Sequence, residues 1–444
     1  MKRHLFLILL LAAVPAAAQP WDGNYPPVTE YAAAHRELYA GNYRTYPFDE
    51  VSPAPLPKRY KPVYISHYGR HGSRFYTSEK GYALIWRMFS DAQDAGALTE
   101  EGRAFWDVFR PLYESEIKGH AGELTTIGER EQALLAAAMV RRYPEVFATG
   151  ARIDARSTTK PRVIASMKAF CTTLRTLRPT LAVNTSANEA DMPVLNCIVP
   201  GNPSVKPFDL RNLDLKGLWK EDYLALRSAM DTVSFFRRMF TDFNVKAYGD
   251  KRDIVQIFYN VCADGPCIAP GFQGLRWLSD EELYPIWRFT NLKFYAIAGP
   301  SEKYSFGRAP ALMAPLLEDI ISLADSDLQG GCAARLRFGH DYQIVSLLSL
   351  LGAEPWVRTL DDPYEVESVF RYNNIPMASN LQLVFWQGKR PDDILVRVLF
   401  NDADLPLPVR RVRGAYYRWA DLRAYFELRL DKAHKLLKDT ESLL

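Results

Sequence analysis

The sequence predicts an α/β protein with a doubly wound, mostly parallel sheet flanked by helices, and with an inserted, mostly helical cap domain. The first observation is a pattern that occurs three times: a β-prone run, a short polar loop and then an amphipathic helix. The second is a block over residues 185–327, where helical patterns are broken by Pro, Gly and Asn without comparable strands. Strands that alternate with helices favour a parallel sheet, and a long strand-free block favours an insertion.

The first junction connects a β-prone run at 63–68 with a helix that starts after Thr77 or Ser78. Either hydroxyl can cap this helix, and apolar residues within 84–89 recur at helical spacing. A further amphipathic helix is expected over 127–143.

The second junction lies near Asp154 and leads to a helix that begins at Pro161. Proline suits the first helical turn, and Thr158 or Thr159 can cap it. Apolar residues within 163–174 then recur at helical spacing. The arginine that follows the proline is therefore placed at a helix N-terminus.

The third junction begins with the alternating residues 334–338 and continues into a helix over 342–351, which Gly352 can end. A hairpin is predicted over 378–400, with its turn at 388–393.

The length of 444 residues fits two or three domains. We expect a signal peptide over 1–18, a core built from 19–184 together with 328–444, and a mostly helical inserted domain over 185–327. Residues 19–60 are rich in Tyr and Pro with little periodicity, so an irregular lead-in is expected at the start of the core.

The N-terminus has the pattern of a cleaved secretory signal. A positive start at Lys2–His4 precedes the apolar run Leu5–Val14 and the small residues Ala16–Ala18. A non-cleaved anchor is the alternative, and the small residues argue against it. We expect a periplasmic or secreted protein that keeps no membrane anchor after cleavage.

The charge balance favours no polyanionic partner. With 55 Lys plus Arg against 52 Asp plus Glu, the formal net charge is +3, too small to argue for binding to nucleic acid or a membrane surface. The five cysteines have no zinc-ligand spacing with histidines, so no metal or cofactor is expected. Cys262 and Cys267 flank a turn-prone sequence and are either a disulfide or two free buried thiols.

The loop after the first strand carries the strongest chemical motif. It reads Arg70-His71-Gly72-Ser73-Arg74. A guanidinium group can donate two hydrogen bonds to two oxygens of one phosphate. A neutral imidazole between two such groups can attack phosphorus. The alternative is a solvated basic turn, but this motif occurs by accident in only about one of several hundred chains of this length.

The other two loops contribute Arg162, His340 and Asp341. Helix N-termini prefer acids, so Arg162 at a helix start suggests a bound anion nearby; otherwise it is a surface charge. Asp341 is either the N-cap of the helix that follows or a proton donor, with His340 beside it holding a phosphate oxygen.

Together these motifs resemble the histidine acid phosphatases, the branch-two histidine phosphatases that include phytases and multiple inositol polyphosphate phosphatases. The resemblance runs from about residue 61 to 400 and rests on the R-H-G-x-R loop at 70–74, the L-T-x-x-G segment at 124–128, the arginine-bearing stretch at 157–169, the H-D motif at 340–341 and the strand start at 376–381. Two features depart from it: Tyr76 stands where the family often has proline, and the multiple inositol polyphosphate phosphatases usually carry H-A-E in place of His340-Asp341.

The resemblance implies a phosphomonoester hydrolase (EC 3.1.3) without cofactor or metal. It implies that His71 attacks phosphorus to give a phosphohistidine, and that Asp341 protonates the leaving alkoxide and then activates water. The side chains it implies for phosphate binding are Arg70, Arg74, Arg162 and His340. A donor aspartic acid must be protonated, which predicts an acidic optimum.

For the substrate, we expect inositol polyphosphates such as phytate, with a broad-specificity acid phosphatase acting on sugar phosphates or nucleotides as the alternative. Lys58, Arg59, Lys61 and Lys80 are candidates to meet phosphates beyond the scissile one, or else ordinary surface cations. A non-catalytic binding protein for phosphorylated ligands is the third interpretation; such a binder needs arginines but no nucleophile and no proton donor. The oligomeric state does not follow from the sequence.

Overall fold

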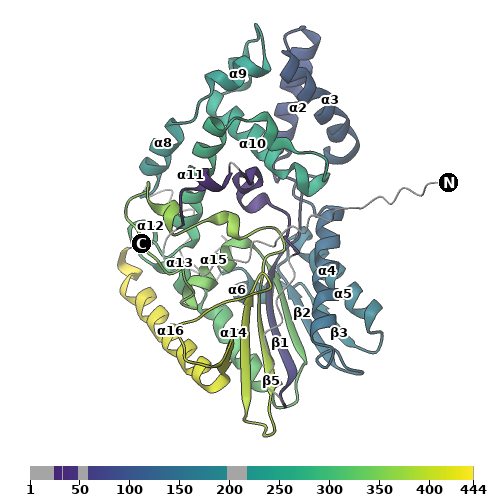
Figure 1. Ribbon diagram of the computed structural model, residues 1–444, viewed down its shortest axis with the longest axis vertical. Coiled ribbons are helices and arrows are strands. Elements are labelled where there is room, and N and C mark those ends of the chain that lie inside the picture. The colour runs from purple at the N-terminus through teal and green to yellow at the C-terminus, as the bar shows by residue number, and fades with distance from the viewer. Residues whose placement is uncertain (1–24, 33, 49–58, 198–217, 444) are drawn as a thin grey trace, which may run out of the picture.

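The computed structural model describes residues 25–32, 34–48, 59–197 and 218–443, with a mixed β-sheet at its centre (Figure 1). The expected signal peptide over 1–18 lies outside the described residues. Within them the sheet has the order β3-β2-β4-β1-β5-β6-β9-β8, and β7 pairs with β6. The strands are β1 (Lys61–Arg70), β2 (Arg152–Ser157), β3 (Ala182–Ser186), β4 (Ala334–Gly339), β5 (Asn380–Gln387), β6 (Ile394–Phe400), β7 (Ala403–Asp404), β8 (Arg411–Arg413) and β9 (Tyr416–Arg418).

One half of the sheet is parallel and the other half is antiparallel. β1 pairs in parallel with β4, and β2 pairs in parallel with both β4 and β3. From β5 onward the pairing is antiparallel, and β5 with β6 forms the predicted hairpin. The predicted α/β class is confirmed, and its parallel part contains the strands of all three predicted junctions.

Helices cover both faces of this sheet. α4 and α5 pack together on one face, and α14, α15 and α16 lie on the other (Figure 1). The helices are α1 (Val28–Ala32), α2 (Glu79–Asp94), α3 (Glu100–Leu112), α4 (Thr126–Arg142), α5 (Pro161–Leu177), α6 (Met192–Leu195), α8 (Lys220–Ser228), α9 (Val233–Met239), α10 (Lys251–Ile268), α11 (Asp280–Ala298), α12 (Glu302–Ser305), α13 (Arg308–Ala311), α14 (Ala314–Asp327), α15 (Asp341–Leu350) and α16 (Trp419–Asp439), and the 3₁₀ segment η1 covers Arg36–Tyr43. In the part of the chain that the structure describes, no helix combines the length and the apolar composition needed to cross a membrane.

The alternation of side chains along β1 divides the core into two layers. Tyr64 and Tyr68 pack with the α14–α16 side, whereas Ile65 packs with the α4–α5 side, and each is at most 1% exposed. Because both faces of the sheet are buried, the strands present polar side chains to solvent mainly at their ends. A site that solvent can reach is therefore expected where the strands end.

The helix starts agree with the predicted junctions except for two caps. Ser78 caps α2 by accepting a backbone N–H, and α5 begins at Pro161. The N-cap of α5 is Lys160, whose side chain forms no capping hydrogen bond. The predicted caps Thr158 and Thr159 are therefore wrong. The N-cap of α15 is His340, and Asp341 is the first helical residue, which leaves its carboxyl available for contacts across the site.

Cys262 and Cys267 lie within α10, which continues through the sequence that predicted a turn between them. Both thiols are free and buried. The turn prediction fails because tertiary packing overrides local propensity: this end of α10 is buried on several sides, including Gly265 against Phe272.

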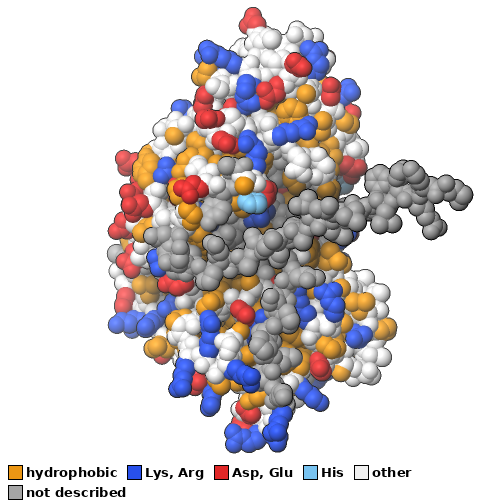
Figure 2. Space-filling view, viewed as in Figure 1, with side chains coloured by type: hydrophobic (Ala, Val, Ile, Leu, Met, Phe, Trp, Pro, Cys, Tyr) orange, Lys and Arg blue, Asp and Glu red, His pale blue; other side chains and the backbone are white. Residues whose placement is uncertain are grey.

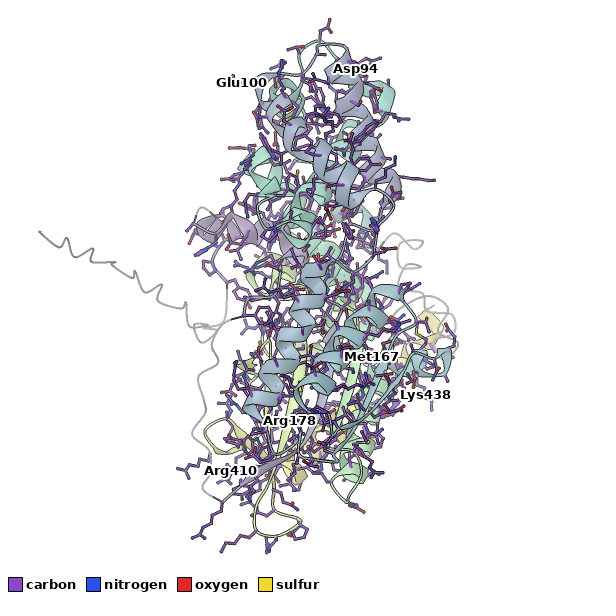
Figure 3. All side chains as sticks on the ribbon, turned by 90° about the vertical axis from the view of Figure 1, so that its right-hand side faces the viewer. Asp94, Glu100, Met167, Arg178, Arg410 and Lys438 are labelled. Carbon is purple, nitrogen blue, oxygen red and sulfur yellow. The ribbon has the colours of Figure 1, made fainter. Side chains whose placement is uncertain are left out.

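The helices at one end of the molecule come from two distant stretches of sequence. α2 and α3 pack with α9 and α10, and the rings of Phe105 and Phe258 are in tilted contact with 4.6 Å between their centres. In Figure 3, Asp94 and Glu100 mark this end, while Arg410 lies at the opposite end. The division into a core and an insertion over 185–327 stays a prediction.

A buried ionic network ties α14 to the parallel strands. Arg337 of β4 has no exposed side-chain surface, and its Nε donates to Oδ2 of Asp319 at 2.7 Å. Arg156 of β2 donates to both oxygens of the same carboxylate, at 2.9 and 3.0 Å. Burial opposes ionisation of Asp319, but Arg337 and Arg156 outweigh it and hold its pKa below the ordinary value.

We expect Asp319→Asn to destabilise the protein by about 3 kcal/mol at pH 7, because it leaves the fully buried guanidinium of Arg337 without its carboxylate and removes one of the three carboxylates around Arg156. Since the folded pKa is lowered, this stabilisation is present above the ordinary carboxyl pKa and is lost as the pH falls through the lowered value. Urea unfolding of both proteins between pH 7 and pH 3 measures the difference. Asp392→Asn, at a pair whose side chains are 76% exposed, is the control and should change nothing measurable. A difference that stays constant down to pH 3 would contradict the ionic explanation.

Candidate active site

The carboxyl ends of β1, β4 and β2 meet at one edge of the sheet. Arg70 pairs with Gly339 across β1 and β4, and Ser157 pairs with Phe338 across β2 and β4. The loops that follow these strands open into a pocket of about 420 Å³. Five of the six predicted site residues line it: His71, Arg74, Arg162, His340 and Asp341. The sixth, Arg70, is 1% exposed and lies against Asp341 beside the pocket.

The imidazole of His71 is held in one tautomer. Its Nδ1 lies 2.9 Å from the carbonyl oxygen of Gly72, and since a carbonyl only accepts, Nδ1 carries the hydrogen. Burial lowers the pKa of His71 well below its ordinary value, and the charges of Arg162 and Arg70 lower it further. The ring is therefore a neutral imidazole whose Nε2 keeps its lone pair.

The loop that carries His71 is packed too closely for side chains at two glycines. A Cβ on Gly72 would lie 2.4 Å from the carbonyl oxygen of Gly128, and one on Gly128 would lie 2.1 Å from that of Ser73. The N–H and Oγ of Ser73 both donate to the buried carboxylate of Glu131, at 2.6 and 2.9 Å. Thr125 caps α4 and also donates to the carbonyl of Ser73. The L-T-x-x-G segment thus fixes the shape of the loop.

Asp341 lies at the centre of a small hydrogen-bonded cluster. Its Oδ2 accepts from the side-chain amide of Asn42 at 2.7 Å and forms an ion pair with Nη2 of Arg70 at 2.9 Å. Its Oδ1 accepts the backbone N–H of Tyr342 at 2.9 Å. Burial opposes ionisation of the carboxyl, but Arg70, His340 and Asn42 together hold the pKa of Asp341 below its ordinary value.

The guanidinium of Arg74 is oriented by Tyr43 and by a carboxyl of α10. Its guanidinium lies over the ring of Tyr43 at 5.1 Å and 3.8 Å from Oδ1 of Asp264, which has no exposed surface. Burial raises the pKa of Asp264 to about 7, although Arg74 and the hydroxyl of Tyr82, which donates to Oδ2 at 3.0 Å, partly offset it. At acidic pH Asp264 is therefore a neutral acid, and Arg74 keeps its full positive charge.

Arg162 and His340 complete the pocket from the other two loops. Arg162 lies in the first turn of α5, and Ser166 one turn later accepts the backbone N–H of Gly72 at 3.1 Å, which joins the two loops. Nε2 of His340 lies 3.2 Å from the hydroxyl of Thr158. Burial lowers the pKa of His340 to about 3, with Arg162 contributing.

Three guanidinium groups of the site each keep one buried donor. The Nε–H groups of Arg70, Arg74 and Arg162 have no acceptor among the described residues. Elsewhere among the described residues such a buried Nε–H occurs on one arginine at a time. Here three arginines with such a donor lie around or beside one pocket. A buried donor without an acceptor costs about 1–3 kcal/mol, so the arrangement favours an anion with several oxygens.

Comparison with known proteins agrees with this geometry. Residues 69–401 match the family model of the histidine phosphatase superfamily (branch 2). The chain belongs to this family. A search of curated proteins gave no match.

Solved structures of a multiple inositol polyphosphate phosphatase and of phytases share the fold. The Bifidobacterium longum multiple inositol polyphosphate phosphatase in complex with inositol hexasulfate has a TM-score of 0.69 at 17% identity, covering 87% of this chain and 97% of that chain. The phytase from D. castellii has a TM-score of 0.67 at 16% identity, covering 89% and 85%. The Klebsiella sp. ASR1 phytase has a TM-score of 0.51 at 13% identity, covering 84% and 97%. At these identities the likeness concerns the fold alone.

The cations predicted to extend the site of this histidine phosphatase are misplaced. Lys61 begins β1, whereas His71 follows its last residue, so the ten-residue strand separates them by about 30 Å. Arg59 precedes Lys61 and is not a lining residue of the pocket, and Lys58 lies outside the described residues. Lys80 is exposed and is not a lining residue. Figure 2 shows that Lys and Arg gather at the end of the molecule that carries the β5–β6 turn, far from the site edge.

The lysines that do line the pocket are Lys160 and Lys293. Lys160 caps α5 and Lys293 comes from α11, so they face the pocket from two different parts of the fold. The sequence pattern could have indicated Lys160, because it lies two residues before the predicted site residue Arg162. Nothing in the spacing around Lys293 indicated the pocket.

Three further side chains of the site escaped the sequence analysis: Asn42, Glu131 and Asp264. Glu131 lies one helical turn after Gly128, and this spacing within the L-T-x-x-G segment was a usable signal. Asn42 and Asp264 come from segments that carried no motif. Among the described residues, no group of three or more His, Cys, Asp or Glu side chains is arranged to hold a metal ion.

Proposed function

We propose that this histidine phosphatase hydrolyses phosphomonoesters through a phosphohistidine intermediate and acts on inositol polyphosphates such as phytate. The observation that carries the proposal is the unprotonated Nε2 of His71 in a pocket that also holds Arg74, Arg162 and the carboxyl of Asp341. A nucleophile, cationic donors for the phosphate oxygens and a proton donor are the three requirements of the reaction.

In the first step Nε2 of His71 forms a bond to phosphorus while the ester P–O bond breaks. The proton of Asp341 moves to the leaving oxygen, which departs as a neutral alcohol. In the second step Asp341 takes a proton from water, the water oxygen bonds to phosphorus and the P–N bond breaks. Inorganic phosphate leaves, and His71 and the protonated Asp341 are restored.

The charged groups around His71 suit the transition state of this transfer. We propose that Arg70, Arg74, Arg162 and His340 donate to the three equatorial phosphate oxygens. Fixed donors in a buried site stabilise that charge without reorganising, and such electrostatic stabilisation supplies much of the rate of phosphoryl transfer. A non-catalytic binder would need these cations but neither a neutral imidazole nor a carboxyl facing the same anion.

The pocket beyond the scissile phosphate favours a substrate with further anionic groups. Lys160 and Lys293 line it from two sides, and a volume of about 420 Å³ admits a substituted six-membered ring. The Bifidobacterium longum protein was solved with inositol hexasulfate, a ring that carries six anionic groups. This supports an inositol polyphosphate over a simple sugar phosphate.

We also propose that the chain is exported to the periplasm or secreted. The support is the sequence pattern of residues 1–18, a positive start followed by an apolar run and small residues at the cleavage site.

We expect His71→Ala to abolish release of phosphate from phytate and from p-nitrophenyl phosphate, a loss of at least about 10⁴-fold in kcat, because the covalent step has no other nucleophile. Phosphate release and acid-quench trapping of a labelled phosphoenzyme measure it. His120→Ala is the control, since this histidine is 53% exposed and pairs with Glu123 on the surface. Tight binding of phytate by a wild-type protein without turnover would show a binding protein instead.

We expect kcat to be maximal below pH 7 and to fall on the alkaline side as Asp341 loses its proton. In the free protein the pKa of Asp341 is low, but a dianionic phosphate beside it raises that pKa and supplies the protonated donor at mildly acidic pH. His71 stays neutral throughout this range because its pKa is far below 6.5. Asp341→Asn should lower kcat on an alkyl phosphate at least about 100-fold and remove the alkaline limb. A maximum above neutrality would exclude Asp341 as the donor.

We expect Lys160→Met and Lys293→Met each to lower kcat/KM for phytate about fivefold, or ~1 kcal/mol, with less than a twofold change for p-nitrophenyl phosphate. The reason is that the lysines meet phosphates beyond the scissile one, which p-nitrophenyl phosphate lacks. Lys61→Met, at the opposite end of β1 from His71, is the matched control. Equal turnover of phytate, glucose phosphates and nucleotides, unaffected by these lysines, would favour the broad-specificity alternative.

A further inference from the structure

The N-terminal 3₁₀ segment η1 sends one polar side chain into the active site. Asn42 is 7% exposed and lines the catalytic pocket, although it precedes the region 69–401 that matches the family. The rest of η1 packs on the 3₁₀ segment at Tyr372–Asn374 and on α10 and α11. A buried polar side chain at this position needs a partner, and its partner is the carboxyl of Asp341 in the site itself.

Asn42 closes a three-membered cluster with Arg70 and Asp341. Its side-chain Nδ2 donates to Oδ2 of Asp341 at 2.7 Å, and its backbone carbonyl accepts from Nη1 of Arg70 at 2.6 Å. Nη2 of Arg70 in turn forms an ion pair with the same Oδ2 at 2.9 Å. The guanidinium of Arg70 is held further by the carbonyl of Ile375 at 2.9 Å.

The backbone delivers Asn42 to this cluster by a turn that requires glycine. Gly41 has φ 58° and ψ −128°, a conformation that residues with a side chain rarely adopt. A Cβ at Gly41 would lie 2.0 Å from the ring of Tyr372. Tyr372 is buried and is held by the hydroxyl of Tyr259, so the position of Asn42 is fixed by packing on both sides.

The two oxygens of Asp341 are therefore not equivalent. Oδ2 accepts the side-chain N–H of Asn42 at 2.7 Å and lies 2.9 Å from Nη2 of Arg70 in an ion pair, so both partners lie at this oxygen. Among the described residues, Oδ1 accepts the backbone N–H of Tyr342 and has no cationic partner at this distance. The other titratable or charged groups that act on the carboxyl are His340, Arg74 and Arg162.

We propose that Asn42 is the positioning residue of the proton donor: with Arg70 it occupies Oδ2 of Asp341, so that the proton for the leaving group is carried on Oδ1 and aimed at the substrate. The proposal rests on the proposed function, because it assigns a role within that reaction. Without the amide, the carboxyl is held by one guanidinium and can rotate, so the proton reaches the leaving oxygen in fewer encounters. Asn42 acts through Asp341 and not on the substrate.

The test compares substrates that differ in their need for a proton. p-Nitrophenyl phosphate has a stable leaving anion, whereas glycerol 2-phosphate leaves as an alkoxide that must be protonated. For Asn42→Leu, which has the same branching and no amide, we expect kcat/KM to fall about 20-fold on glycerol 2-phosphate and less than threefold on p-nitrophenyl phosphate. kcat/KM is the right quantity because it reports the steps up to formation of the phosphoenzyme.

A second variant keeps the proposal testable if the first folds poorly. Asn42→Asp places a carboxyl against Oδ2, and two carboxyls at this distance share one proton. We expect the alkaline limb of kcat on glycerol 2-phosphate to move up by about one pH unit, while the limb with Ser305→Ala stays in place. Ser305 is fully buried in α12, where its hydroxyl donates to the carbonyl of Ser301 at 2.7 Å, so its replacement reports a loss of stability alone.

The outcomes separate the inference from the proposed function. If the wild-type protein releases no phosphate from either ester, the proposed function is wrong. If it does, and Asn42→Leu lowers kcat/KM equally on both substrates, as a purely structural residue would, the positioning role is overturned. An unchanged alkaline limb in Asn42→Asp would overturn it as well.

Discussion

The parallel register of β1, β4 and β2 is the constraint on which the site depends. Because Arg70 lies opposite Gly339 and Ser157 lies opposite Phe338, three strands end at the same level and their loops share one pocket. A shift of one residue in either pairing would turn each side chain of that strand to the other face and separate the loops. The helical layers on both faces, and the Asp319 network between α14 and the strands, maintain this register.

The pocket concentrates positive charge, and two buried acids respond to it in opposite ways. Asp341 lies 2.9 Å from Arg70 and also accepts the amide of Asn42, so its pKa is lowered. Asp264 lies 3.8 Å from Arg74 without exposed surface, so burial dominates and raises its pKa to about 7. At acidic pH the neutral Asp264 orients Arg74 without cancelling its charge. The strength of the phosphate site therefore depends on how deeply each carboxyl is buried.

The sequence predicted the parts of the site that are encoded locally. The loop at 70–74 and the His340-Asp341 pair follow strands, and strand-to-helix junctions are visible as a change of hydrophobic period. Asn42 was not predictable, because it reaches Asp341 across a separation of 299 residues from a segment without periodicity. Lys61 was misplaced because nearness in sequence was taken for nearness in space: it begins β1, and the loop with His71 follows the other end of that strand. Asp264 was missed because Gly265 and Pro266 suggested a turn where tertiary packing continues a helix.

The proposed reaction requires an order of protonation opposite to that of the free side chains, since His71 must be neutral while Asp341 holds a proton. Burial and the arginines meet the first requirement permanently by lowering the pKa of His71. The same arginines work against the second, because they also lower the pKa of Asp341. Only a dianion bound between them neutralises their effect on the carboxyl, so the donor gains its proton when the substrate is present. One set of cations thus keeps the nucleophile ready in the free enzyme and makes protonation of the donor depend on substrate binding.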